Sequence, residues 1–171
     1  MTFSVSKTSL DGVFKIIPPT IFDDFRGKYV EIYNEKLYKD AGINYHYVQD
    51  DYAVSHRDVL RGIHGDEKTA KLVKAVYGKM YMVVVNNDPA HPQYRKWEAF
   101  TISHENCIQV SVPPKFGIGF LVLSEEAVFH YKQSTYYGEA KQFTIKWDDP
   151  AYKIWWPKTS GTIISQRDLL E

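Results

Sequence analysis

Short segments in which apolar and polar residues alternate recur along most of the chain. Such alternation is typical of β-strands that bury one face, because successive side chains of a strand point to opposite sides. Turn-forming sequences, among them Y-G-K, N-N-D-P, V-P-P-K and L-S-E-E, separate the segments. The pattern predicts strands over residues 12–17, 28–33, 45–53, 70–76, 79–85, 96–102, 107–112, 118–123 and 127–132, and another through V-L-R-G-I-H at 59–64.

About ten short strands at this spacing predict a β-sandwich or barrel, and in particular a double-sheet jelly roll. Helical patterns are few. One short helix is expected over Asn34–Asp40, with Asn34 as its N-cap and Gly42 at its end, and a second helical turn is expected to begin at Ser165. The 171 residues contain no internal repeat, linker or low-complexity segment. We therefore expect a single domain over residues 1–171.

Charge and cysteine content narrow the classes of function. The chain has 21 Lys and Arg residues against 21 Asp and Glu residues, so an anionic ligand would need a local cluster of cations. Cys107 is the only cysteine, which excludes an intrachain disulfide and fits the reducing cytoplasm. No signal-peptide core is seen, and no apolar run approaches the roughly 20 residues of a membrane span. We expect a cytoplasmic protein without a nucleic-acid or membrane partner.

His64 follows a buried-looking strand and lies between two glycines in V-L-R-G-I-H-G-D. It can be a packed, half-buried histidine, a metal ligand or a general base. A metal site needs several ligands close together, and the six histidines form no H-x-H or H-x-x-x-H pair, so we expect no metal. An imidazole ordinarily titrates near neutral pH, which suits a general base. The packed and catalytic interpretations both stay open at this point.

Three cations could surround His64. Arg61 lies between V-L and G-I, on the strand that leads into the glycine turn, where an unpaired charge would be costly. Lys71 opens the segment A-K-L-V, and Arg26 follows an acidic turn in F-D-D-F-R-G-K. Each cation alone is most often a solvated surface charge. If they converge on His64, they form a site for an anion such as a diphosphate.

Alternation in A-V-F-H-Y-K puts Tyr131 on the same face as Ala127 and Phe129. If that face is the inner one, the Tyr131 hydroxyl points between the sheets and needs a polar partner. It is then either a core tyrosine bound to the backbone or a proton donor that faces a substrate.

Asp168 follows Ser165 by three residues in S-Q-R-D. This spacing is that of a capping box, in which the carboxylate serves the N-terminus of a helix. Alternatively, the carboxylate orients an imidazole and stabilises the cation formed on proton uptake, as in a His–Asp dyad. The sequence does not decide whether residues 64 and 168 meet.

Several stretches, in this order, resemble the dTDP-4-dehydrorhamnose 3,5-epimerase family of nucleotide-sugar 4-keto epimerases, from about Ile16 to Asp168. No single motif is decisive, and the collinear order makes the resemblance specific. The motifs are F-D-D-F-R-G-K-Y-V-E, V-Q-D-D-Y-A-V-S, V-L-R-G-I-H, A-K-L-V-K-A-V-Y-G-K, V-P-P-K-F-G-I-G-F-L-V-L-S, H-Y-K-Q-S-T-Y-Y, I-K-W-D-D-P, W-P and S-Q-R-D.

The resemblance implies a cupin-like jelly roll with short peripheral helices, a homodimer, no cofactor, and a dTDP- or GDP-linked 4-keto sugar as substrate. It implies that His64 is the base, Tyr131 the acid and Asp168 the partner of the histidine. Lys71 corresponds to a family lysine near the keto oxygen of the sugar. The residues expected to bind substrate are Arg26, Glu31, Gln49, Arg61 and Tyr137, the last from the Tyr136–Tyr137 pair near the nucleotide base.

The chemistry agrees with these roles. A ketone at C4 acidifies the protons on C3 and C5, because the carbanion is delocalised as an enolate. A base on one face removes the proton and an acid on the other face returns one, a process typically accelerated roughly 10²–10⁴-fold by positioned groups. A good donor such as Lys71 at the enolate oxygen can add about 3 kcal/mol. We expect a cofactor-independent epimerase that inverts C3, with or without C5, of an NDP-4-keto-6-deoxy sugar in the biosynthesis of a cell-surface polysaccharide.

The sequence departs from the family pattern near the expected site. Gly65 and Asp66 stand where an aromatic residue and glutamine usually follow the histidine. Ile118 replaces the histidine of F-A-H-G-F, and Asp51 replaces the asparagine of Q-D-N. These changes predict an altered pocket around the sugar, and the loss of polar groups could limit the reaction to C3. The sequence R-G-I-H-G-D resembles that of the family branch that acts on GDP-linked 4-keto-6-deoxy-heptoses, which are used to build bacterial capsules.

Two alternatives remain. A 3,4-ketoisomerase on the same jelly roll usually carries a second histidine close to the first, which Gly65 and Asp66 do not provide. A non-catalytic sugar-nucleotide-binding jelly roll would keep the cations and rings. It need not keep His64, Tyr131 and Asp168 together.

Overall fold

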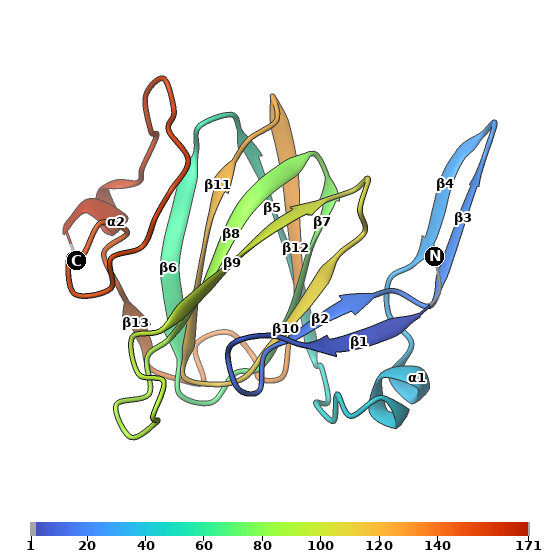
Figure 1. Cartoon of the computed structure of the whole chain (residues 1–171), viewed down its shortest axis with the longest axis horizontal. Coiled ribbons are helices and arrows are strands. Elements are labelled where there is room, and N and C mark those ends of the chain that lie inside the picture. Colours follow the sequence, from blue (N-terminus) through green and yellow to red (C-terminus); the bar gives the residue numbers. More distant parts are fainter. Residues whose placement is uncertain (1–2, 171) are drawn as a thin grey trace.

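The structure is a computed structural model that describes residues 3–170 as two packed antiparallel sheets and a projecting hairpin (Figure 1). The predicted all-β, cupin-like jelly roll with short peripheral helices is confirmed. The strands are β1 (Ser4–Lys7), β2 (Phe14–Ile17), β3 (Thr20–Asp24), β4 (Gly27–Glu31), β5 (Gln49–His56), β6 (Leu60–Asp66), β7 (Lys71–Tyr77), β8 (Lys79–Asn86), β9 (Trp97–Ser103), β10 (Gln109–Val112), β11 (Phe116–Val122), β12 (Glu126–Gln133) and β13 (Gln142–Thr144), and the helices are α1 (Glu35–Asp40) and α2 (Gln166–Leu170).

The two main sheets have strand orders β1-β2-β10-β7-β12-β5 and β13-β6-β11-β8-β9. Consecutive strands of the chain often lie in different sheets, as in a jelly roll. Every strand predicted from the alternation is present, although β1, β3 and β13 were not predicted. These three strands have four, five and three residues, and none of them buries a residue fully, so they show no clear alternation of buried and exposed positions.

The fifth strand begins later than predicted. The alternation suggests a strand from Tyr45, but β5 starts at Gln49. Tyr45 and Tyr47 instead belong to an aromatic layer with Tyr33, and the ring centroids of Tyr33 and Tyr47 are 5.6 Å apart. Packing of these rings outweighs the strand pattern in this segment.

The main core lies between the two sheets, as the alternation predicts. Met82 and Val84 of β8 face Val73 of β7 and Phe129 of β12 across this core. Tyr131 packs against the same cluster, so the face of A-V-F-H-Y-K that carries Ala127, Phe129 and Tyr131 is the inner one. The sheets therefore deliver side chains from both sides to the space between them.

Outer layers cover parts of both sheets. The helix α1 begins at Asn34, whose Oδ1 accepts the Leu37 N–H at 3.2 Å, and the backbone turns at Gly42, which has a φ of +92°. Both features were predicted. Tyr38 of this helix is fully buried on the outside of the six-stranded sheet. Within residues 3–170, no helix combines the length and hydrophobicity that crossing a membrane requires.

Strand β6 continues through Gly65 to Asp66, so the predicted glycine turn is wrong. Gly62 has a φ of +102°, and the pairing of β6 with β11 shifts register beside it. In a regular strand, side chains three residues apart point to opposite faces. The irregularity at Gly62 instead allows both Arg61 and His64 to border one cavity.

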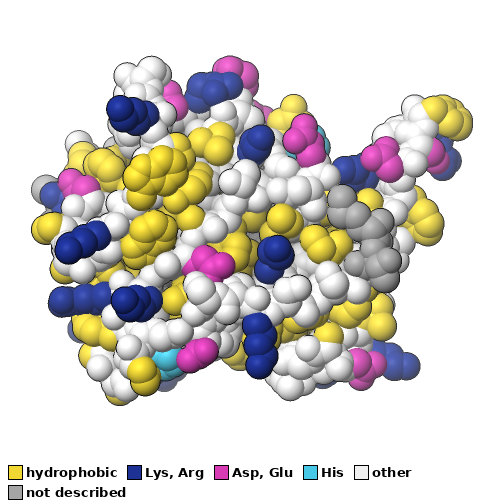
Figure 2. All heavy atoms as spheres, in the orientation of Figure 1, with side chains coloured by type: hydrophobic (Ala, Val, Ile, Leu, Met, Phe, Trp, Pro, Cys, Tyr) yellow, Lys and Arg dark blue, Asp and Glu magenta, His cyan; other side chains and the backbone are white. Residues whose placement is uncertain are grey.

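Strands β3 and β4 form an arm that projects away from the two sheets (Figure 1). Figure 2 shows hydrophobic side chains at the end of this arm. Phe25 is 99% exposed, and Phe22 and Tyr29 are each 65% exposed. Exposed aromatic rings in this density are typical of an interaction surface.

Candidate active site

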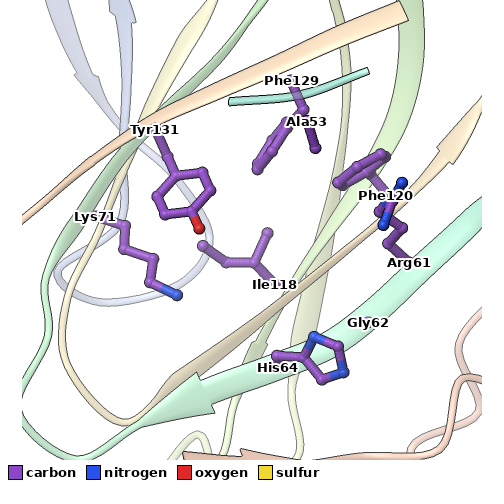
Figure 3. Close-up of a pocket in the computed structure, with 9 residues that line it drawn as sticks. All are labelled: Ala53, Arg61, Gly62, His64, Lys71, Ile118, Phe120, Phe129 and Tyr131. Atoms are coloured by element: carbon purple, nitrogen blue, oxygen red, sulfur yellow. The ribbon is translucent and has the colours of Figure 1, made fainter. Parts of the chain in front are cut away.

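A cavity of about 220 Å³ lies between the two sheets. Figure 3 shows polar side chains entering it from opposite walls, with apolar side chains between them. The lining residues are Ala53, Arg61, Gly62, His64, Lys71, Ile118, Phe120, Phe129 and Tyr131.

The imidazole of His64 is held by a carboxylate from the end of the chain. Its Nε2 lies 2.7 Å from Oδ1 of Asp168, and the Asp168 residue is only 3% exposed. The other carboxylate oxygen accepts the Gly62 N–H at 3.4 Å. With Nε2–H donated to Asp168, Nδ1 keeps the lone pair that can accept a proton.

The capping and dyad interpretations of S-Q-R-D are both partly realised. The Asp168 N–H donates to Ser165 Oγ at 3.2 Å, so Ser165 caps α2 as predicted. The Asp168 carboxylate does not complete a capping box, because it binds His64. Capping therefore fixes the backbone that presents this carboxylate to the imidazole.

Tyr131 and Lys71 enter the cavity from the opposite sheet, on β12 and β7. The Lys71 Nζ atom lies 5.4 Å from the centroid of the Tyr131 ring. Figure 3 shows the Tyr131 hydroxyl and Lys71 Nζ both directed into the cavity, across from His64. One sheet thus provides an imidazole and the other a phenol and an amine.

Burial changes the protonation behaviour of both groups on this wall. It lowers the pKa of Lys71, and the negative charges of Asp66 and Asp51 partly oppose that change. Burial also raises the pKa of Tyr131, and Asp51 and Tyr137 act in the same direction. The phenol therefore keeps its proton at neutral pH, as a proton donor must.

Of the expected substrate-binding residues, Arg61 lines this cavity, and Tyr137, which is hydrogen-bonded to Gln49, lies near the lining residue Tyr131. Arg61 is exposed, so the expectation of a buried charge is wrong, and its Nε donates to Ser55 Oγ at 2.9 Å. Gln49 Oε1 accepts the Tyr137 N–H at 2.9 Å. The Tyr137 residue is 66% exposed, which leaves its ring available to a ligand.

The other two expected binding residues do not reach the cavity in this copy of the chain. Arg26 lies on the arm, with its side chain 77% exposed, and pairs with Asp24 at 2.6 Å. Glu31 ends β4 and accepts hydrogen bonds from Thr20 Oγ1 at 2.8 Å and Asn34 Nδ2 at 2.9 Å. The predicted convergence of Arg26 with Arg61 and Lys71 is therefore not seen within one chain.

An apolar wall was not predicted from the sequence. The rings of Phe120 and Phe129 stack with centroids 4.4 Å apart, and Ile118 and Ala53 extend this wall. The alternation of apolar and polar residues in β11 and β12 was the one sequence signal for this wall. It does not distinguish residues that line a cavity from residues that fill the core. His64 is the only histidine among the residues that line the cavity. No group of three potential metal ligands occurs within residues 3–170.

The departures after the histidine have local structural reasons. A Cβ atom at Gly65 would collide with the backbone carbonyl oxygen of Phe116 and with Cζ of Phe143, so the structure leaves no space for a side chain there. Asp66 is buried, and its Oδ1 accepts the N–H groups of Lys68 at 2.8 Å and Thr69 at 2.7 Å. Asp66 therefore shapes the loop that leads to Lys71.

Comparisons with known proteins agree over nearly the whole chain. A family model described as dTDP-4-dehydrorhamnose 3,5-epimerase matches residues 7–170. The dTDP-4-dehydrorhamnose 3,5-epimerase of Methanothermobacter thermautotrophicus is 36% identical over 170 residues, which cover 97% of this chain and 91% of that protein. The dTDP-4-dehydro-6-deoxyglucose 3-epimerase of Streptomyces bikiniensis is 32% identical over 154 residues, with 88% and 79% coverage.

A solved structure shares the fold. It is the dTDP-6-deoxy-D-glucose-3,5-epimerase of Legionella pneumophila in complex with dTDP-4-keto-L-rhamnose. The TM-score is 0.91 at 33% sequence identity, and the match covers 98% of this chain and 90% of that one. The two sheets described above are therefore arranged as in that enzyme.

Proposed function

Because this chain belongs to the dTDP-4-dehydrorhamnose 3,5-epimerase family, we propose that it inverts C3 of a nucleotide-linked 4-keto-6-deoxy sugar, with or without C5. One observation carries the proposal. An imidazole bound to Asp168 lies across a single cavity from the phenol of Tyr131. The relatives include enzymes named 3,5-epimerase and 3-epimerase, so both outcomes occur among similar proteins.

In the first step, His64 removes the proton from the carbon next to the ketone. Nδ1 accepts this proton, and Asp168 stabilises the resulting imidazolium through the 2.7 Å contact to Nε2. The electron pair of the C–H bond moves onto the C4 oxygen and forms an enolate. Lys71 Nζ stabilises the negative oxygen, a contribution of about 3 kcal/mol for a well-placed donor.

In the second step, Tyr131 returns a proton to the opposite face of the same carbon. Because Tyr131 and His64 come from different sheets, the carbon is approached from two sides. The phenolate formed is then reprotonated, and His64 gives its proton to solvent. The ketone of the substrate supplies the required acidity, so the chemistry calls for neither a metal nor a redox carrier.

The nucleotide is dTDP in the named relatives, and GDP is the second candidate. The feature that favours GDP is the R-G-I-H-G-D sequence at residues 61–66, which is similar to the branch that acts on GDP-linked sugars. A GDP-linked 4-keto-6-deoxy-heptose, used for a capsular polysaccharide, is the finer form of this candidate.

We further propose that the chain acts as a homodimer. The arm carries Arg26 away from its own cavity and exposes the rings of Phe22, Phe25 and Tyr29. A second copy is the occupant that would both cover these rings and receive Arg26 near its diphosphate site. The outer face of the six-stranded sheet adds exposed Tyr52, which is 72% accessible and provides further apolar area for such contact.

The cytoplasm is the proposed location. Cys107 is buried and unpaired, which fits a reducing compartment.

The test is incubation of the protein in D₂O with a panel of dTDP- and GDP-linked 4-keto-6-deoxy sugars, followed by NMR. We expect one deuteron at C3 with inversion for a 3-epimerase, and a second at C5 for a 3,5-epimerase. Movement of the carbonyl from C4 to C3 would instead identify a ketoisomerase. Binding without exchange for every member of the panel would favour the non-catalytic module.

A further inference from the structure

Asp51 lies on β5, opposite the cavity-lining residue Tyr131, although it was not among the residues expected to act. The alternation of β5 places Asp51, Ala53 and Ser55 on the inner face, while Tyr52 faces outward. Ala53 lines the cavity, and Ser55 accepts a hydrogen bond from Arg61, another lining residue. Asp51 continues this row toward the end of the sheet that holds Tyr131.

Strand register places the Asp51 carboxylate beside the proposed acid. Asp51 pairs directly with Tyr131 in the antiparallel ladder of β5 and β12. Side chains of directly paired residues lie on the same face of a sheet, about 5 Å apart at Cβ. Lys71 lies on β7, the next strand of the same sheet. Three adjacent strands thus place a carboxylate, a phenol and an amine on the inner face of the same sheet.

Gln49 orients the Asp51 carboxylate. The Gln49 amide nitrogen lies 2.9 and 3.2 Å from the two Asp51 oxygens, and the amide oxygen accepts the Tyr137 N–H. In the part of the chain that the structure describes, no Lys, Arg or His forms an ion pair with Asp51. Its charge is therefore available to the groups that face it.

Few charged or titratable groups surround Lys71 and Tyr131. Asp51 faces both of them from β5, and Asp66 of β6 faces Lys71. Tyr137 faces Tyr131 from the loop after β12. The charged or titratable side chains that line the cavity from the opposite sheet are Arg61 and His64.

We propose that Asp51 is a positioning residue that acts through its charge, by keeping the Lys71 ammonium and the Tyr131 phenol in their protonated forms. This inference rests on the proposed function, in which Lys71 stabilises the enolate and Tyr131 donates a proton. Burial disfavours the charged ammonium form of Lys71, and a neighbouring negative charge favours that form again. The same charge disfavours a phenolate, so both groups keep their protons to higher pH. An asparagine at residue 51 cannot do this.

Substitution of Asp51 tests the proposal better than substitution of Asp66, although both carboxylates act on the pKa of Lys71. Asp66 holds its loop through two backbone N–H groups, so its substitution would also disturb the backbone. The Asp51→Asn variant keeps an oxygen that can accept the Gln49 hydrogen bond. It therefore removes the charge with little change in shape.

The experiment measures the protonation of both groups directly, by NMR titration of protein labelled at lysine ¹³Cε and tyrosine ¹³Cζ. Signals are assigned with the Lys71→Arg and Tyr131→Phe variants. In Asp51→Asn, we expect both midpoints to fall by about 0.5–1 pH unit. In Asp51→Glu, which keeps the negative charge, both midpoints should lie close to their wild-type values. Asp40→Asn, which removes an equal charge from the exposed end of α1, should leave both midpoints unchanged.

Activity provides a second measurement. The alkaline limb of kcat in Asp51→Asn should move to lower pH by the same amount, with kcat at its optimum little changed. Unmoved midpoints in Asp51→Asn, or equal shifts in Asp40→Asn, would overturn the inference whether or not the protein turns over a sugar. Shifted midpoints together with no proton exchange on any 4-keto sugar would support the charge coupling and contradict the proposed function instead.

Discussion

The Nε2 atom of His64 lies 2.7 Å from Oδ1 of Asp168, although 104 positions separate the two residues in the sequence. The carboxylate is buried, and the imidazole is half-buried at the edge of the cavity. A buried carboxylate in this position selects the tautomer whose Nδ1 is free to accept a proton. The contact thus supports the proposed role of His64 as the base.

Replacement of Asp168 should lower the rate while the fold is retained. In Asp168→Asn, the amide can donate to Nε2 and favour the wrong tautomer, so we expect kcat to fall roughly 10²–10⁴-fold. The measurement is steady-state epimerisation, with circular dichroism as the check on folding. Arg167→Gln, on the exposed side of the same helix, is the matched control. An Asp168→Asn enzyme within threefold of wild type would contradict this role.

Replacement of Lys71 should affect kcat more than KM. Lys71→Met removes the proposed donor at the enolate oxygen, and we expect kcat to fall about 10²–10³-fold. In the wild type, burial lowers the pKa of Lys71, so activity should be lost on the alkaline side at a lower pH than for an exposed lysine. Lys68→Met, an exposed lysine nearby, should behave as wild type. A change in KM alone would assign Lys71 to binding.

Mixing two inactive variants should restore activity if the arm serves a partner. In a hybrid dimer of Arg26→Ala and His64→Asn chains, one cavity contains an intact His64 and receives an intact Arg26. After subunit exchange at equal amounts, we expect about a quarter of wild-type activity, because half of the dimers carry one complete site. Light scattering should give the mass of a dimer. Absence of recovery despite demonstrated exchange would place Arg26 in its own subunit's site or outside both.

Lys74 provides a test of stability on the outer face of the six-stranded sheet. Its Nζ atom is buried without a hydrogen-bond partner among residues 3–170, and burial lowers the pKa of Lys74 to about 8. Below that pH, the lysine is charged in both folded and unfolded states, and the folded state bears the full cost of burial. Lys74→Met should therefore stabilise the protein by about 1–3 kcal/mol at neutral pH.

The gain from Lys74→Met should shrink as the pH rises from about 8 toward the usual lysine value, because the folded lysine loses its proton above about 8 and this loss costs less free energy at higher pH. Chemical denaturation at pH 7 and pH 10 measures both values. Lys96→Met, at an exposed lysine, is the control. Destabilisation at pH 7 would indicate that the assembled protein supplies Lys74 with a partner.

Local patterns in the sequence predicted most of the fold. Alternation grouped Tyr131 with Ala127 and Phe129 on one face of β12, and the structure shows that this face is the inner one. Capping residues located α1, since Asn34 and Gly42 act through contacts within a few positions. Of the two strands of the arm, β4 was predicted and β3 was not, because the rings of the arm are exposed and show no buried face.

The site could be predicted less completely, because it depends on contacts between distant segments. Family resemblance indicated His64 and Asp168, but no local pattern places α2 beside β6. Arg61 was expected to be buried, yet the irregular backbone at Gly62 directs it to the exposed rim. Arg26 could not be placed, because its position depends on the arm and, we propose, on a second chain.

Deuterium exchange in the Tyr131→Phe and His64→Asn variants tests the central claim most directly. If His64 removes the proton and Tyr131 returns one to the opposite face, Tyr131→Phe should still incorporate deuterium at C3 of the substrate while forming little inverted product. His64→Asn should do neither. If His64→Asn exchanges C3 as fast as wild type, the imidazole is not the base, and the two-sided mechanism proposed for this cavity is wrong.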